Sequence, residues 1–163
     1  MDLSILQAQW QVGAVAPEDV PAKALALLDD ATAYPAVLEL AMMHGASVWE
    51  IRPVVERAFA EAGLPPVTNE QAHWRLAYAT AREIVAGETA SREGAEVLWR
   101  ICNELDYPMP LRYFVYLAAD YGEGPEGPVT EAAWFDARIV EAARELLARE
   151  GRDVLARPSE PPV

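Results

Sequence analysis

Apolar residues recur at helical spacing through most of the 163-residue chain. On the stretch after residue 68, for example, Trp74, Ala77, Ala81 and Ile84 share one face of a helix, whereas Arg82 lies away from it. The predicted helices cover roughly residues 21–28, 36–43, 47–62, 68–86, 91–105, 111–120 and 130–150. We therefore expect an all-α fold, a single compact bundle of about six to seven short to medium helices.

Residues that start and stop helices punctuate this pattern. A Ser or Thr before an apolar run is typical of a helix N-cap, and a Gly after it is typical of a helix end. Thr68 followed by Gln71 has the spacing of a capping box. The predicted caps and stops are Gly45, Ser47, Gly63, Thr68, Gly87, Thr130 and Gly151.

The segment 111–120 is apolar nearly all round, which predicts a helix at the centre of the bundle. A buried strand could show the same short run, but Ala118 and Ala119 and the neighbouring helices favour a helix. Large aromatic residues inside helices are interpreted as core residues, although exposed aromatics beside acids would instead mark an interface. This interpretation covers Trp74, Tyr78, Trp99, Tyr113 and Trp134.

The two ends of the chain lack this pattern. Residues 1–18 show no sustained period and are expected to form an irregular arm, and the Pro-rich residues 157–163 are expected to form a disordered tail. The domain is thus predicted to span residues 1–156. The first ten residues lack the basic and apolar segments of a secretion signal, and no run approaches about 20 apolar residues, so we expect a cytoplasmic protein.

The charge is strongly negative, with 26 acidic against 13 basic residues and a formal net charge of −13. Such a surface repels phosphate backbones and anionic lipids, so nucleic-acid and membrane binding are not expected. A partner protein with a basic surface remains compatible with it. The single cysteine, Cys102, excludes an intramolecular disulfide and suits a reducing compartment.

Candidate catalytic groups are few. Only His44 and His73 could serve as histidine bases, and the helical pattern places Cys102 in a core-facing stripe, where a free thiol behaves as a small hydrophobe. The pairs Asp29–Asp30 and Glu123–Glu126 could act in acid–base chemistry, but charged residues also solvate every helix face. No catalytic residue is therefore predicted.

Cofactor and metal motifs are incomplete. Glu70 and His73 have the Glu-x-x-His spacing of carboxylate-bridged di-metal bundles, but such a site needs a second motif, and Ala41 stands three residues before His44. The only lysine, Lys23, follows no glycine-rich phosphate-binding turn. No cofactor or metal is predicted.

The segment Ala81–Arg100 contains Ile-Val-Ala-Gly-Glu, then Gly-Ala, then Leu-Trp. In this order of motifs it resembles a group of small uncharacterised helical bacterial proteins. The likeness extends through Val37–Ala41 and Glu61–Pro66 to Glu141–Leu147, about three quarters of the chain, and departs from the pattern at Tyr107–Tyr121. The resemblance implies a helical bacterial protein and brings no catalytic residue.

Together these features favour a non-enzymatic acidic protein-binding module, such as an immunity or antitoxin-like protein that sequesters a basic partner. The candidate partner-binding residues lie around the glycine- and proline-rich loop, and they are Asp120, Tyr121, Glu123 and Glu126. One alternative is a small enzyme or ligand-binding protein that uses Asp120, Tyr121 and Tyr116. Another is an accessory subunit of an oligomeric complex.

Overall fold

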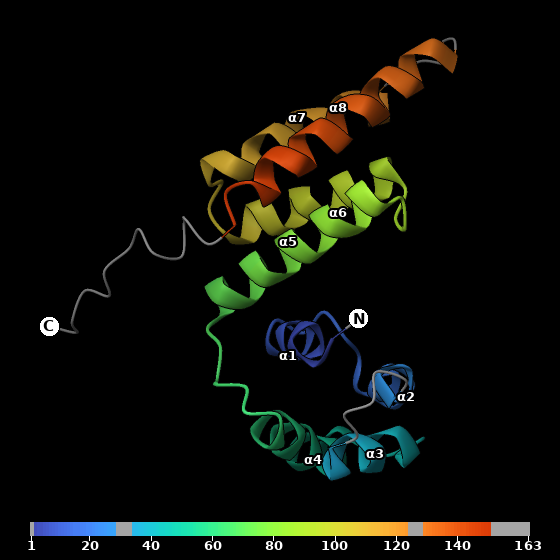
Figure 1. Cartoon of the computed structure of the whole chain (residues 1–163), viewed down its shortest axis with the longest axis vertical. Coiled ribbons are helices and arrows are strands. Elements are labelled where there is room, and N and C mark those ends of the chain that lie inside the picture. Colours follow the sequence, from blue (N-terminus) through green and yellow to red (C-terminus); the bar gives the residue numbers. More distant parts are fainter. Residues whose placement is uncertain (1, 29–33, 124–128, 151–163) are drawn as a thin grey trace, which may run out of the picture. The chain divides into compact units, whose positions relative to one another are not determined.

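The computed structural model describes residues 2–28, 34–123 and 129–150, without the side chains of residues 120–123 and 129–131. Every regular element in these ranges is a helix, which confirms the all-α prediction, including a helix over 111–120 (Figure 1). The α-helices are α1 (Leu3–Gln11), α2 (Val20–Leu27), α3 (Pro35–Met42), α4 (Val48–Glu61), α5 (Asn69–Ala86), α6 (Ser91–Glu104), α7 (Met109–Glu123) and α8 (Val129–Leu147), and a 3-10 turn covers Pro17–Asp19. In these ranges, no helix combines the length and hydropathy that crossing a bilayer requires.

The helices form two units, one in residues 1–76 and one in residues 77–163, and α5 begins in the first and ends in the second. The single domain predicted for residues 1–156 stays a prediction. The predicted tail at 157–163 lies outside the described residues.

The first unit has an aliphatic core between α1, α2, α3 and α4. Leu6, Val20, Leu40, Ile51 and Val55 are almost completely buried there. On α2, for example, the buried residues Val20, Ala24 and Leu27 recur at three- to four-residue spacing, as expected for an element with one apolar face. Burial of this face holds helices that are too short to be stable alone, since α2 and α3 have eight residues each.

The irregular arm predicted for residues 1–18 is wrong, because Leu3–Gln11 forms α1. Asp2 caps this helix by accepting hydrogen bonds from the backbone N–H groups of Ser4 and Ile5, at 2.7 and 3.1 Å. The buried amide of Gln7 then donates to the carbonyl oxygen of Pro65 at 2.9 Å and accepts from Arg75 at 2.9 Å. These polar contacts attach α1 to segments far along the chain.

The second unit packs α6 against α7, and α8 against both. Leu98, Leu111, Phe114, Ile139 and Leu146 supply its largest fully buried side chains. The helix α7 is amphipathic, because Leu111, Phe114 and Leu117 are buried while Tyr113 and Tyr116, between them in sequence, are exposed. The exposed side of α7 is where the candidate site lies.

Several predicted caps and stops are confirmed, but α7 runs over Met109–Glu123 instead of the predicted 111–120, and α8 ends at Leu147 instead of near residue 150. Gly45, Gly63 and Gly87 end helices with φ of 77°, 67° and 73°, the left-handed conformation that glycine adopts without strain. The capping box of Thr68 and Gln71 is formed, with reciprocal hydrogen bonds of 3.0 and 3.2 Å. Ser47 is the N-cap residue of α4, and the carboxylate of Glu50 accepts hydrogen bonds from both its N–H and its hydroxyl. The last helix begins at Val129, one residue before the predicted cap, and the side chain of Thr130 and Gly151 lie outside the description.

Candidate partner-binding surface

Three large side chains form an exposed row on α7. Met109, Tyr113 and Tyr116 are 72%, 41% and 66% exposed. Their spacing of four and three residues places them on one face of the helix, since a helical turn takes 3.6 residues. The opposite face of α7 is buried in the second unit.

Trp134 and Arg138 extend this row onto α8. Trp134 is 55% exposed and meets Phe135 edge to face, with ring centroids 5.0 Å apart. The guanidinium carbon of Arg138 lies 5.8 Å from the centre of the Trp134 ring, within the range of a cation–π interaction. Met109, Tyr113, Tyr116, Trp134 and Arg138 are called the aromatic surface below.

Arg138 joins the two helices. Its Nη2 donates to the hydroxyl of Tyr113 at 3.3 Å, and its Nη1 pairs with Oε2 of Glu141 at 2.8 Å. The hydrogen bond to Tyr113, followed by the charges of neighbouring groups such as Glu141, raises the pKa of Arg138. The guanidinium therefore stays charged, and its partners hold it in place between Trp134 and Tyr113.

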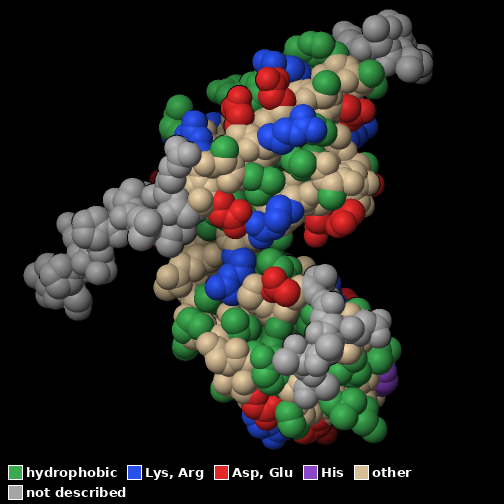
Figure 2. Space-filling model, in the orientation of Figure 1, with side chains coloured by type: hydrophobic (Ala, Val, Ile, Leu, Met, Phe, Trp, Pro, Cys, Tyr) green, Lys and Arg blue, Asp and Glu red, His purple; other side chains and the backbone are tan. Residues whose placement is uncertain are grey.

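A shallow hollow of about 300 Å³ lies beside the aromatic surface. Its lining residues are Tyr113, Arg138, Glu141, Ala142 and Glu145. Glu145 is exposed and has no hydrogen-bond or ion-pair partner within residues 2–28, 34–123 and 129–150. Around α7 and α8, Figure 2 shows hydrophobic side chains interspersed with acidic and basic ones on the visible surface.

The core interpretation is wrong for three of the five helical aromatics, because Trp99, Tyr113 and Trp134 are exposed. Tyr78 is buried as expected, and Trp74 is half-buried. Trp134 lies five residues before the buried Ile139, which is about 140° round a helix. That angle could have shown from the sequence that Trp134 points away from the core.

The predicted partner-binding residues are not tested by these contacts. Asp120, Tyr121 and Glu123 form the last turn of α7, where the backbone alone is described, and Glu126 lies outside the described residues. Tyr116, assigned above to a possible enzyme, is instead part of the exposed row. Sequence reasoning missed the aromatic surface because it grouped residues by the loop that they flank, rather than by helix face.

A second set of exposed apolar side chains lies on the first unit. Leu38 and Met42 are one turn apart on α3, Leu25 lies on α2, and Trp49 in the first turn of α4 is 80% exposed. In the described residues no cation–π contact or hydrogen bond joins an arginine to these four side chains, as Arg138 joins Trp134 and Tyr113 on the second unit.

The residues considered for catalysis or metal binding do not assemble into a site in the described part of the chain. Cys102 is fully buried, and burial raises the pKa of its thiol, so the reactive thiolate is disfavoured. His44 is exposed and His73 half-buried. No three His, Cys, Asp or Glu side chains gather there as a metal site would require.

No protein-family model, no curated protein and no solved structure matches this chain. The resemblance to small helical bacterial proteins therefore stays a prediction.

Proposed function

We propose that this chain is a non-enzymatic protein-binding module of the immunity or antitoxin type, which holds a basic partner protein at the aromatic surface. The observation that carries the proposal is the contiguity of exposed Trp134, Tyr113 and Tyr116 with Arg138. Trp, Tyr and Arg dominate the residues whose truncation weakens protein interfaces most, and Met is also enriched there.

The contacts that hold Arg138 also support this function. Arg138 is held by Tyr113 and Glu141, and the α7 row stands on the buried Phe114 and Leu117. Side chains that are ordered before binding lose less conformational entropy on association, so the same contacts give a higher affinity.

The charge indicates the chemistry of the partner. A net charge of −13 accelerates association with a basic protein and opposes association with an acidic one. The expected partner is therefore a protein with a basic surface, and its affinity should fall as ionic strength rises.

The test compares two exposed tryptophans. The tagged full-length chain retrieves its partner from the organism that encodes it, and the purified partner is titrated by calorimetry against the wild type, Trp134→Ala and Trp49→Ala. We expect Trp134→Ala to weaken binding by about thirtyfold, the effect of losing roughly 2 kcal/mol at an interface hot spot. Trp49→Ala, which removes an exposed tryptophan from the other unit, should leave the dissociation constant unchanged.

Two results would count against the proposal. One is equal binding by Trp134→Ala and the wild type, which would place the interface elsewhere. The other is a partner whose affinity does not change with salt, which would remove the charge argument. The enzyme and the accessory-subunit alternatives remain predictions. Light scattering on the purified chain tests the second, because a strict monomer with no exposed apolar patch would count against it.

A further inference from the structure

The hollow beside the aromatic surface has unequal charges in its lining. Glu141 and Glu145 contribute two carboxylates, and Arg138 contributes one guanidinium. Arg138 is already paired with Glu141, so its charge is largely compensated. Glu145 keeps a free carboxylate in the part of the chain that the structure describes, and it sets the net negative charge of the hollow.

The remaining lining is apolar or aromatic. Tyr113 and the buried Ala142 complete the lining of the hollow. This combination suits a group with an apolar stem and a cationic head, because the stem can lie along the ring while the head meets the carboxylate. An arginine side chain has both parts, and its planar head also stacks on aromatic rings and pairs with a carboxylate through two parallel hydrogen bonds.

The size of the hollow limits what it can take. About 300 Å³ is at the lower end of the range for small-molecule sites, and the hollow is open to solvent. It therefore fits one side chain presented by a larger molecule better than it fits a free ligand, which would have most of its surface exposed.

Resting on the function proposed above, we infer that this hollow receives one arginine side chain of the basic partner. The arginine head pairs with Glu145, its stem packs on Tyr113 and Ala142, and the aromatic surface contacts the partner around it. Glu145 is thus a specificity-determining residue, because a partner without a cation at this position would leave the carboxylate desolvated and unpaired.

The hollow can be tested without knowing the partner. The probe is N-acetyl-arginine amide, titrated into the isotope-labelled full-length chain while backbone amide resonances are followed by NMR. We expect saturable shifts with millimolar affinity, confined to the amides around Tyr113 and residues 138–145. The neutral isostere N-acetyl-citrulline amide should cause at least tenfold smaller shifts at the same concentration.

Two matched variants assign the effect. Glu145→Gln removes the free carboxylate without changing its shape, and it should weaken arginine binding at least threefold. Glu104→Gln, the control, neutralises another exposed glutamate of the same unit, at the end of α6, and should change nothing. Shifts that spread over acidic residues of both units, an equal affinity in Glu145→Gln, or no saturable shift at millimolar concentration would overturn the inference.

The result of the arginine-probe experiment can be distinguished from the result of the partner-binding experiment. If the arginine probe fails while Trp134→Ala still weakens partner binding, the arginine site is refuted and the binding function stands. If the probe binds at the hollow but neither Trp134→Ala nor Glu145→Gln affects the partner, the proposed interface and the role of the hollow in it are both refuted.

Discussion

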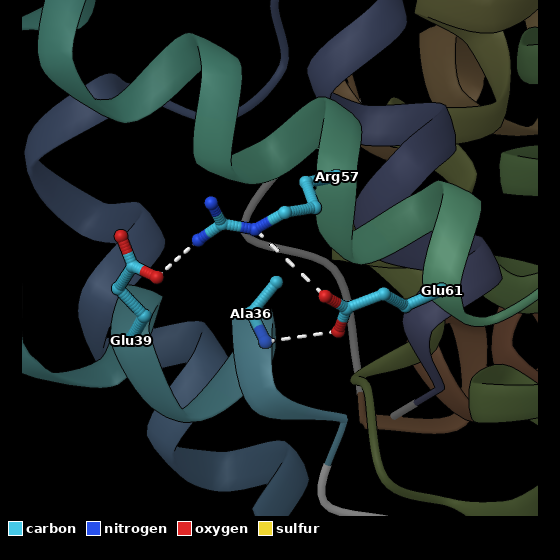
Figure 3. Close-up of polar contacts among 4 residues, drawn as sticks. All are labelled: Ala36, Glu39, Arg57 and Glu61. Atoms are coloured by element: carbon cyan, nitrogen blue, oxygen red, sulfur yellow. Dashed lines mark hydrogen bonds and ion pairs between the residues drawn. The ribbon is translucent and has the colours of Figure 1, made fainter.

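The carboxylate of Glu61, in the last turn of α4, accepts a hydrogen bond from the backbone N–H of Ala36 in the first turn of α3, at 2.9 Å (Figure 3). Pro35 has no N–H to donate, and Tyr34 before it provides no side-chain cap. Glu61, which lies on another helix, therefore satisfies a free backbone N–H at the N-terminus of α3, as a local N-cap residue usually does. Arg57 pairs with the same carboxylate and with Glu39 on α3.

Replacing Glu61 by Ala should destabilise the chain by about 1 kcal/mol, the usual cost of losing an N-cap. The loss combines one hydrogen bond to α3 with a favourable charge at the positive end of its dipole. Urea unfolding followed by circular dichroism measures the change. The control is Glu56→Ala, which removes an exposed glutamate from α4, and equal destabilisation by both variants would contradict the capping role.

The sequence predicts most helices because the signals that start, continue and end them lie in neighbouring residues. Apolar spacing placed α2 to α8, and glycines such as Gly63 and Gly87 marked their ends, since only the conformation of the chain at that point matters. The helix α1 was not predicted, although Asp2 at its N-cap is a local signal, because the burial of its residues depends on distant segments. Gln7 is buried in a polar contact with Pro65 and Arg75, more than fifty residues away, and no period in the first 18 residues encodes that.

The aromatic surface illustrates a different limit. Residue type alone predicts burial for Trp134 and Tyr113, but both are exposed. The position of Trp134 on its helix, relative to the buried Ile139, already indicates that it points away from the core. The sequence could not predict that Arg138 contacts both side chains, because this depends on how α7 and α8 pack. The hollow with its free Glu145 depends on the same packing and was equally unpredictable.

Gly94 in α6 allows close approach to α5, because a Cβ added there would overlap Cγ1 and Cδ1 of Ile84. Ile84 is nearly buried and β-branched, so its side chain has little freedom to move aside. Gly94→Ala should gain up to about 1 kcal/mol of helix propensity but lose about 1–3 kcal/mol to overpacking, a net destabilisation. Chemical denaturation at equilibrium measures it.

The same substitution in an Ile84→Ala background tests the cause. With the isoleucine atoms removed, the methyl group that Gly94→Ala adds has room, and it should stabilise the chain by about 1 kcal/mol relative to the Ile84→Ala single variant. An effect of Gly94→Ala that is the same in both backgrounds would show that the contact with Ile84 is not responsible.

Asp106 and Tyr107, in the turn between α6 and α7, adopt the left-handed conformation with φ of 58° and 56°. This conformation is uncommon for residues with a Cβ, and tyrosine has no short polar group to compensate. Tyr107→Gly should relieve strain of about 1 kcal/mol, whereas Tyr107→Ala removes the same ring and keeps the strain. We expect the Gly variant to have the higher midpoint of thermal unfolding. A midpoint equal to that of the Ala variant would refute the strain.

Cys102 provides a pH-dependent prediction. Burial raises the pKa of its thiol in the folded chain, with Arg112 opposing the shift. As pH rises above about 8.5, the thiol ionises first in the unfolded chain. The thiol's contribution to stability is complete below that pH and is lost as pH rises through the pKa of the folded chain. Between pH 7 and 10 the wild type should therefore lose stability relative to Cys102→Ala, measured by urea midpoints at each pH. A difference between the two proteins that is constant with pH would mean that the folded thiol titrates like an unfolded one.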